Sequence, residues 1–172
     1  MMLPTIDAYA PREIARKIEA AGLTKARSDT LSLLVLAVLA GAFIALGAIF
    51  FTVVVTHSTL GFGVTRLLGG LAFSLGLILV IVGGAELFTG NNLVAMAWAS
   101  RRITSAELLR NWVLVYVGNA LGALGTVLLV LVGTVRNLLA VTVGNLLGGT
   151  VLVAGVYWLA YLRPSVRTPL AQ

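Results

Sequence analysis

One stretch of this chain, Gly83 to Asn92, places polar and flexible residues inside an otherwise apolar run, and Glu86 is the ionisable residue among them. Glu86 is the only acidic residue within a predicted membrane span, and a carboxylate in a membrane is costly enough to be a functional candidate. Two roles are open to it. It can titrate as a proton carrier, or it can accept hydrogen bonds from free backbone amides and hold the shape of the stretch. The surplus of amides beside the glycines favours the second role.

Thr89, Asn91 and Asn92 add uncharged hydrogen-bonding groups to the same stretch. Thr89 can donate from its hydroxyl, and Asn91 or Asn92 is expected to cap a short helix that follows. The amino end of that helix would present free amides and a partial positive charge to the membrane interior, which suits an anion. The alternative is that these residues only satisfy the polar groups of the break.

Four apolar residues flank this stretch: Phe73 and Leu77 lie four residues apart on one helix face, and Leu87 and Phe88 follow later. Most such residues serve packing. If the stretch lines a pore, they are the residues expected to form apolar constrictions that gate by excluding water.

The length of the surrounding apolar run predicts a broken helix. Leu67 to Ala99 is 33 residues, and a continuous helix of that length would rise about 50 Å, against about 30 Å of hydrocarbon. Gly83, Gly84 and Gly90 permit the unusual backbone angles that a break needs. Irregular backbone is tolerated at membrane depth only where it is buried or lines a watery cavity, so residues 83–91 are the predicted pore or binding site.

The composition predicts an all-α polytopic membrane protein. The 172 residues are 59% hydrophobic and only 10% charged, which excludes an ordinary soluble domain and disorder alike. Cysteine is absent and histidine occurs once, so we expect no metal site, cofactor or Cys/His nucleophile pair. No nucleophile, base and orienting group come together within the spans, so an enzyme is not expected.

The apolar runs divide the chain into three regions. They are an N-terminal segment (1–29), a membrane domain (30–163) and a tail (164–172), with predicted spans at about 31–56, 67–100 (broken at 83–91), 111–132 and 137–162. Ten of the twelve Lys and Arg residues fall in three segments on one side of this topology, which is the positive-inside pattern and not a nucleic-acid patch. Both termini are therefore expected in the cytoplasm.

The N-terminal segment contains a predicted amphipathic helix from Pro11 to Ala21, with Gly22 just past its end. Ile14, Ile18 and Ala21 share its apolar face. The helix is expected either to rest on the lipid surface or to form a packed cytoplasmic cap. The first apolar run begins at Leu31 and is too long for a signal-peptide core, so no cleavable signal is expected.

The third and fourth predicted spans share a short motif. Val117 to Gly122 matches Val143 to Gly148 in five of six positions, on helices that run in opposite directions. Such a match is typical of an inverted-topology repeat, which places a site on discontinuous helices. It is also what ordinary Gly-x-x-x-Gly helix packing produces, and both explanations remain open.

Three sequence patterns resemble the formate/nitrite transporter family. They are Phe73-Ser74-Leu75-Gly76-Leu77, Gly84-Ala85-Glu86-Leu87-Phe88-Thr89-Gly90-Asn91, and Asn111-Trp112 through Tyr116-Val117-Gly118-Asn119. The fourth span, from Val141 to Arg163, is similar to the last helix of that family. The resemblance covers nearly the whole chain.

The resemblance implies an aquaporin-like inverted-repeat fold in a bacterial-type inner membrane, assembled as a homo-pentamer. Each protomer would have its own pore for small monovalent anions such as formate or nitrite. Leu87, Phe88 and Thr89 match the loop that gates the cytoplasmic side of the pore, with Thr89 as the polar contact. Phe73 and Leu77 match constriction positions, and Asn91 would line the same path. Glu86, Gly83, Gly84 and Gly90 would support the loop.

The sequence departs from the family in one large respect. The family has six spans, whereas this chain passes from the third to what resembles the sixth, without the pair that supplies the second broken helix. The central pore histidine and a nearby loop lysine of the family have no counterpart, since His57 lies elsewhere. Fold family and transport are therefore separate questions for this chain.

Two other functions compete with anion passage. A four-span proton-coupled exporter would use Glu86 as its carboxylate, and drug efflux lost in Glu86→Gln would favour it. A non-transporting remnant or partner subunit would associate with six-span relatives through its packing faces, and co-purification with such a relative would favour that reading.

Overall fold

The computed structural model describes residues 9–135 and 148–162, and throughout these ranges the regular elements are helices. In chain order they are α1 (Pro11–Ala26), α2 (Thr30–Val55), α3 (Phe62–Val82), α4 (Phe88–Asn91), the 3-10 helix η1 (Asn92–Val94), α5 (Ala95–Ala99) and α6 (Ser105–Val135). A last helical segment, Gly148–Leu162, contains α8 (Gly155–Tyr157) between wider turns.

Three described helices are long and apolar enough to cross a membrane: Thr30–Val55, Phe62–Val82 and Ser105–Gly133. The 26 residues of α2 rise about 39 Å, which exceeds the roughly 30 Å of a hydrocarbon core. This confirms a helical multi-pass membrane protein. The predicted fourth span, 137–162, lies partly outside the described residues, and its described part is helical from Gly148 onward.

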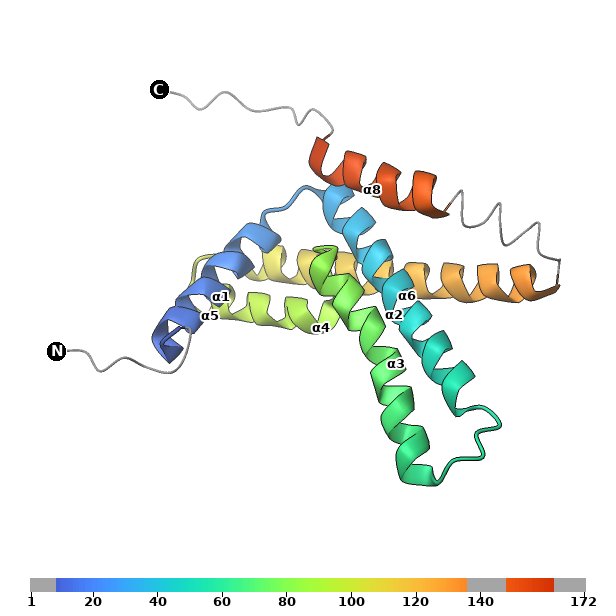
Figure 1. Cartoon of the computed structure of the whole chain (residues 1–172). Coiled ribbons are helices and arrows are strands. Elements are labelled where there is room, and N and C mark those ends of the chain that lie inside the picture. Colours follow the sequence, from blue (N-terminus) through green and yellow to red (C-terminus); the bar gives the residue numbers. More distant parts are fainter. Residues whose placement is uncertain (1–8, 136–147, 163–172) are drawn as a thin grey trace.

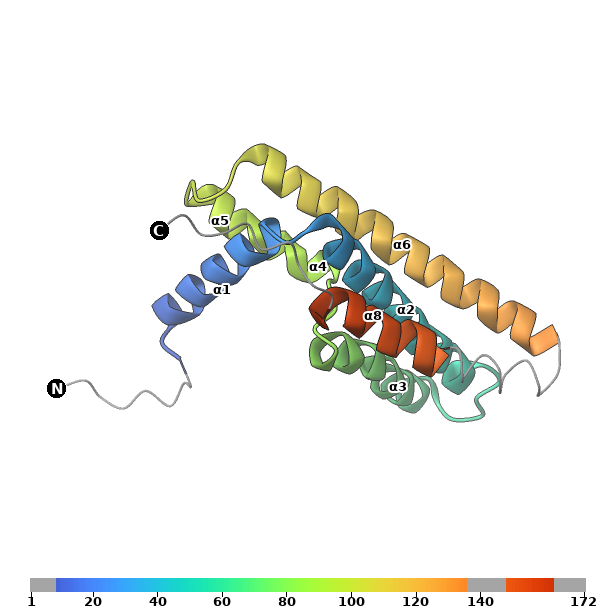
Figure 2. The same ribbon diagram turned by 90° about the horizontal axis from the view of Figure 1, so that it is seen from above.

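Helix α2 lies between α3 and α6, and the last helical segment also lies beside it (Figures 1 and 2). Glycines let α2 and α3 approach. A Cβ added at Gly47 would lie 2.8 Å from the Phe73 carbonyl, and one at Gly76 would lie 2.8 Å from the Phe43 carbonyl. Such backbone contact is how membrane helices associate without a hydrophobic driving force.

The contact between α2 and α6 uses the same device. Gly41 packs against the backbone of Asn119, while Gly118 and Gly122 pack against Ala37 and Val38 of α2. The Gly-x-x-x-Gly pattern of the third span is thus a packing surface. Its partner motif, 143–148, falls almost entirely outside the described residues, so the inverted repeat remains a prediction.

Helix α1 differs from its prediction. It continues to Ala26, five residues beyond Ala21, because Gly22 is not a stop. Gly22 is buried, and a Cβ there would lie 3.3 Å from the Cα of Val94 and 3.4 Å from the Cβ of Ala97. Because Gly22 has no side chain, this middle part of α1 can pack closely against η1 and α5.

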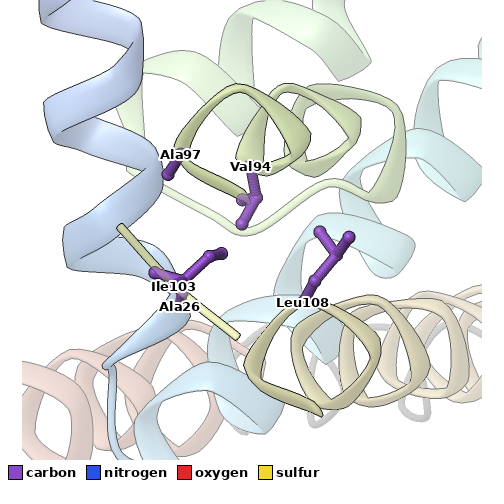
Figure 3. Close-up of a cluster of buried hydrophobic side chains, with 5 residues drawn as sticks. All are labelled: Ala26, Val94, Ala97, Ile103 and Leu108. Atoms are coloured by element: carbon purple, nitrogen blue, oxygen red, sulfur yellow. The ribbon is translucent and has the colours of Figure 1, made fainter. Parts of the chain in front are cut away.

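The packed face of α1 also differs from the predicted one. Ile14 and Ala21 are exposed, whereas Gly22, Leu23 and Ala26 face the protein. Ala26 joins a buried cluster with Val94, Ala97, Ile103 and Leu108, so α1 packs against η1, α5 and the start of α6 (Figure 3). This contact supports the packed-cap interpretation of the segment. Asp29 then caps α2 by accepting a hydrogen bond from the Ser32 amide at 3.1 Å.

Candidate functional site

The predicted break is present, and it is shorter than expected. Helix α3 ends at Val82, and helix resumes at Phe88, so the irregular backbone is Gly83–Leu87 rather than 83–91. Gly84 has a φ of 60°, a left-handed value that most other residues adopt only with strain. Gly90 lies inside α4 with open space around it, so the backbone there does not require glycine.

The prediction that Asn91 or Asn92 caps the short helix is wrong. The residue before the first helical turn is Leu87, which has extended backbone angles. Asn91 ends α4 and Asn92 begins η1, so both lie well inside the helical stretch 88–99. The side chain of Asn91 is fully buried and makes tertiary contacts instead.

Asn119 of α6 satisfies much of the break. Its Oδ1 accepts a hydrogen bond from the Phe88 amide at 2.9 Å, and its Nδ2 donates to the carbonyls of Glu86 at 2.9 Å and Ala37 at 2.8 Å. The Glu86 amide donates to the Leu36 carbonyl at 3.2 Å. Backbone freed by the break is therefore paired with α2 and α6, as a low-dielectric surrounding requires.

The carboxylate of Glu86 has a partner that the sequence did not indicate. Its Oε2 accepts a hydrogen bond from Lys25 Nζ at 2.8 Å, in an ion pair whose side chains are 12% and 34% exposed. We expected backbone amides of the break as donors. In the described part of the chain the carboxylate pairs with α1 instead, because α1 continues past Ala21 and brings Lys25 to the break.

Lys25 also connects the break to α6. Its Nζ donates to Asn91 Oδ1 at 3.1 Å, Asn91 Nδ2 donates to Asn111 Oδ1 at 3.0 Å, and Asn111 Nδ2 donates to the Lys25 carbonyl at 3.1 Å. Trp112 Nε1 closes the cluster by donating to the Asn91 carbonyl at 3.0 Å. We call Lys25, Glu86, Asn91 and Asn111 the polar cluster. Asn91 and Asn111 are both fully buried, and each amide is used as donor and acceptor.

This pairing bears on the role of Glu86. A proton carrier must release and regain its proton in a path that conducts, whereas this carboxylate is fixed by a cation and linked to three helices. The contacts support the structural role of Glu86 over the exporter's carboxylate.

The remaining predicted site residues lie at different places around the break. Thr89 is exposed on the first turn of α4. Leu87 is half-buried against the cluster of Leu39, Ala40, Val80 and Ala85. Phe88 packs on Leu33, Ala37 and Val115, and its ring meets Trp112 and Tyr116 edge to face.

Phe73 and Leu77 lie further from the break, on α3. Phe73 is half-buried and Leu77 is 42% exposed. At 1.5 Å per residue, Leu77 precedes Gly83 by about 9 Å and Phe73 by about 15 Å along the helix. The consecutive residues Leu87, Phe88 and Thr89 have different surroundings, and the constriction role of Phe73 and Leu77 remains a prediction.

Comparison with known proteins places these residues in a family. The model of the formate/nitrite transporter family matches residues 12–136, which contain the break, Lys25, Asn111 and Asn119. The match ends before residues 148–162, so the similarity of the fourth span to the last helix of the family remains a prediction.

Curated relatives agree. The "Formate channel FocA" of Escherichia coli K12 is 45% identical over 125 residues, which are 72% of this chain and 44% of FocA. The "Uncharacterized transporter YrhG" of Bacillus subtilis is 46% identical over 116 residues, covering 66% of this chain and 44% of the relative. The "Probable formate transporter" of Methanothermobacter thermautotrophicus is 33% identical over 129 residues, 73% of this chain and 47% of the relative.

This chain thus spans less than half the length of these relatives. The match covers most of the chain itself, including the break and the helices α2 to α6. The chain belongs to the formate/nitrite transporter family.

Proposed function

We propose that this chain supplies one of the two broken helices of a transporter or channel for small monovalent anions such as formate and nitrite. The break Gly83–Leu87 would form half of the anion path. Thr89 would be its polar contact, and Leu87, Phe88, Phe73 and Leu77 its apolar lining.

The observation that supports this most directly is the way the break is held. Its irregular backbone is paired by Asn119 and Leu36, and its carboxylate by Lys25, which leaves Thr89 exposed on the first turn after the break. A hydroxyl beside the amino end of a helix can stabilise an anion without binding it as tightly as a fixed positive charge would.

Family membership also supports a wider proposal. We infer an aquaporin-like fold in a bacterial-type inner membrane, with four spans in this chain, both termini in the cytoplasm and a pentameric assembly. Asn91, which the sequence placed on the anion path, is assigned instead to the polar cluster, because it is fully buried between Lys25 and Asn111.

A chimera with FocA tests whether the break can form part of an anion path when the rest of a full-length channel is present. Residues 12–136, which match the family model, would replace the corresponding segment of Escherichia coli FocA, so that the chimera has the length of that relative. Formate uptake would be measured in liposomes that hold the purified chimera, beside liposomes with FocA and empty liposomes. We expect saturable uptake above the empty liposomes.

The control variant is Phe62→Ala in the same chimera, since Phe62 lies at the far end of α3 and is 79% exposed. It should carry formate as the unmodified chimera does. A folded chimera that conducts no more than empty liposomes would contradict the proposal.

A further inference from the structure

The last helical segment contacts the break through one side chain, Tyr157. Its hydroxyl donates a hydrogen bond to the Gly83 carbonyl at 2.7 Å. Tyr157 lies in α8, outside the residues that the family model matches, so this contact joins the family-matched break to a part of the chain beyond the match.

Gly83 needs such a donor because of its place in the chain. Gly83 is the residue that ends α3, and Gly84 then turns away with a φ of 60°. The Gly83 carbonyl therefore cannot receive the helical bond that a continuing turn would supply. Among the residues that the structure describes, its donor is the Tyr157 hydroxyl.

The surroundings make this hydrogen bond more important than one at a wet surface. Tyr157 and Val156 pack against the buried cluster of Leu39, Ala40, Val80 and Ala85, with Phe43 beside them. In an apolar surrounding, the loss of the hydrogen-bond donor to a carbonyl destabilises the fold by the full desolvation free energy of that carbonyl. The segment is also tied to α2 where Ser32 Oγ donates to the Ala160 carbonyl at 3.5 Å, and Figures 1 and 2 both draw it beside α2.

We propose that Tyr157 is a positioning residue for the broken helix, and that its hydroxyl holds Gly83–Leu87 in shape from the carboxy-terminal helix. Three elements then bond to the backbone at the break, namely α2 through the Leu36 carbonyl, α6 through Asn119 and α8 through Tyr157, while α1 binds the Glu86 side chain through Lys25. This inference concerns contacts within the chain and does not depend on anion passage.

Hydrogen exchange of the full chain in lipid nanodiscs tests the proposal. The variant Tyr157→Phe keeps the ring and removes the hydroxyl. The amides of Gly84, Ala85 and Glu86, which bond to the carbonyls of Ile81, Val80 and Leu36, should exchange about 2-fold to 10-fold faster. The amides of α6 should keep their rates, because the effect is confined to the break.

Two further variants separate the hydroxyl from general packing. Tyr116→Phe removes a hydroxyl from an exposed tyrosine of α6 while keeping its ring against Phe88, and it should leave exchange at the break unchanged. Introducing p-aminophenylalanine at position 157 restores a donor and should return the rates toward those of the original chain.

Equal exchange at Gly84–Glu86 in Tyr157→Phe and Tyr116→Phe would overturn the proposal. Faster exchange spread evenly over α2, α3 and α6 would also overturn it, since that pattern indicates loss of packing rather than of one hydrogen bond. If Tyr157→Phe does not yield folded protein, the p-aminophenylalanine variant is compared directly with the original chain. Slow exchange at the break in that variant supports the role of the donor, and fast exchange there opposes it.

Discussion

At the scale of single residues, the proposed function gives Thr89 and Glu86 different roles: Thr89 would contact the anion, and Glu86 would support the break. Thr89 is exposed, while Glu86 is paired with Lys25 and its backbone is bonded to α2 and α6. Changes at these two positions should therefore have different consequences, one for anion passage and the other for folding.

We expect Thr89→Val in the FocA chimera to lower formate flux by at least about tenfold, which is the effect of losing one hydrogen bond to a charged group. Folded yield should stay unchanged, because the side chain is exposed. Thr89→Ser keeps the hydroxyl and serves as the matched control. Normal conduction by the valine variant would show that Thr89 does not touch the anion.

Lys25 gives the second prediction at this scale. Lys25→Met leaves the Glu86 carboxylate and Asn91 Oδ1 without their donor, so we expect it to lower the free energy of unfolding by about 1–3 kcal/mol. Unfolding in mixed micelles measures this. Glu86→Ala should likewise reduce folded yield, because it leaves the ammonium group of Lys25 without its carboxylate.

Arg27→Met is the matched control for Lys25→Met. Arg27 Nε lies 3.8 Å from Glu107 Oε1, with side chains 62% and 34% exposed, and such surface pairs contribute less than about 1 kcal/mol. The same cost for both variants would mean that the polar cluster contributes no more than a surface ion pair.

The sequence singled out Glu86 as an unusual carboxylate within a span, but it did not indicate that Lys25 is its ion-pair partner. Lys25 looked like one of five basic residues in a surface segment, because nothing local distinguishes it from Arg12 or Arg16. Lys25 pairs with Glu86 because α1 continues through the buried Gly22 and ends beside the break. That information lies in tertiary contacts.

At the scale of elements, uninterrupted apolar runs were predictable, whereas some helix ends were not. The first span was predicted at 31–56, and the helix is Thr30–Val55. The agreement is close because a long run without charges follows directly after Asp29, which caps the helix. Pro11 begins α1 as predicted, but two other local signals misled: Gly22 does not stop α1, and Asn91 does not cap α4. In both cases packing against another helix overrode the local preference.

Glycine spacing on α6 permits a prediction about helix contact. Gly122→Ala places a Cβ against the Val38 carbonyl of α2, so we expect it to cost about 1–3 kcal/mol in the free energy of unfolding. Gly125→Ala lies on the same helix with open space around it, and it should be neutral or stabilise by up to about 1 kcal/mol. Unfolding of both variants in mixed micelles checks the difference, and equal stability would argue against close contact of α2 and α6.

At the scale of the whole molecule, the basic residues predict how the chain is oriented. Residues 1–29 and the segment between α5 and α6 should face the cytoplasm, and the turn between α2 and α3 should face outward. The chain has no cysteine, so single substitutions can be labelled without background. An impermeant maleimide should label Thr59→Cys in intact cells and Ser105→Cys only after lysis. The opposite pattern would reverse the orientation.

Much of the polar backbone of the break is hydrogen-bonded within the described chain, but an anion path needs more than that. An anion that enters a membrane loses its hydration shell, and polar groups on several sides must replace it. In an inverted-repeat transporter the site lies between two broken helices that face each other. The sequence predicts one such helix here, and the segment that matches FocA covers 44% of that channel.

We therefore expect the 172-residue chain alone to insert in liposomes and to take up no more formate or nitrite than empty liposomes do. The glycine faces of α2, α3 and α6 let these helices pack directly, so a closed bundle is favoured over an open path. A pentamer of identical chains would not change this, because each neighbour has the same one predicted broken helix. The FocA chimera in parallel liposomes is the positive control. Saturable formate uptake by the chain alone, lost in Thr89→Val, would show that one broken helix is sufficient.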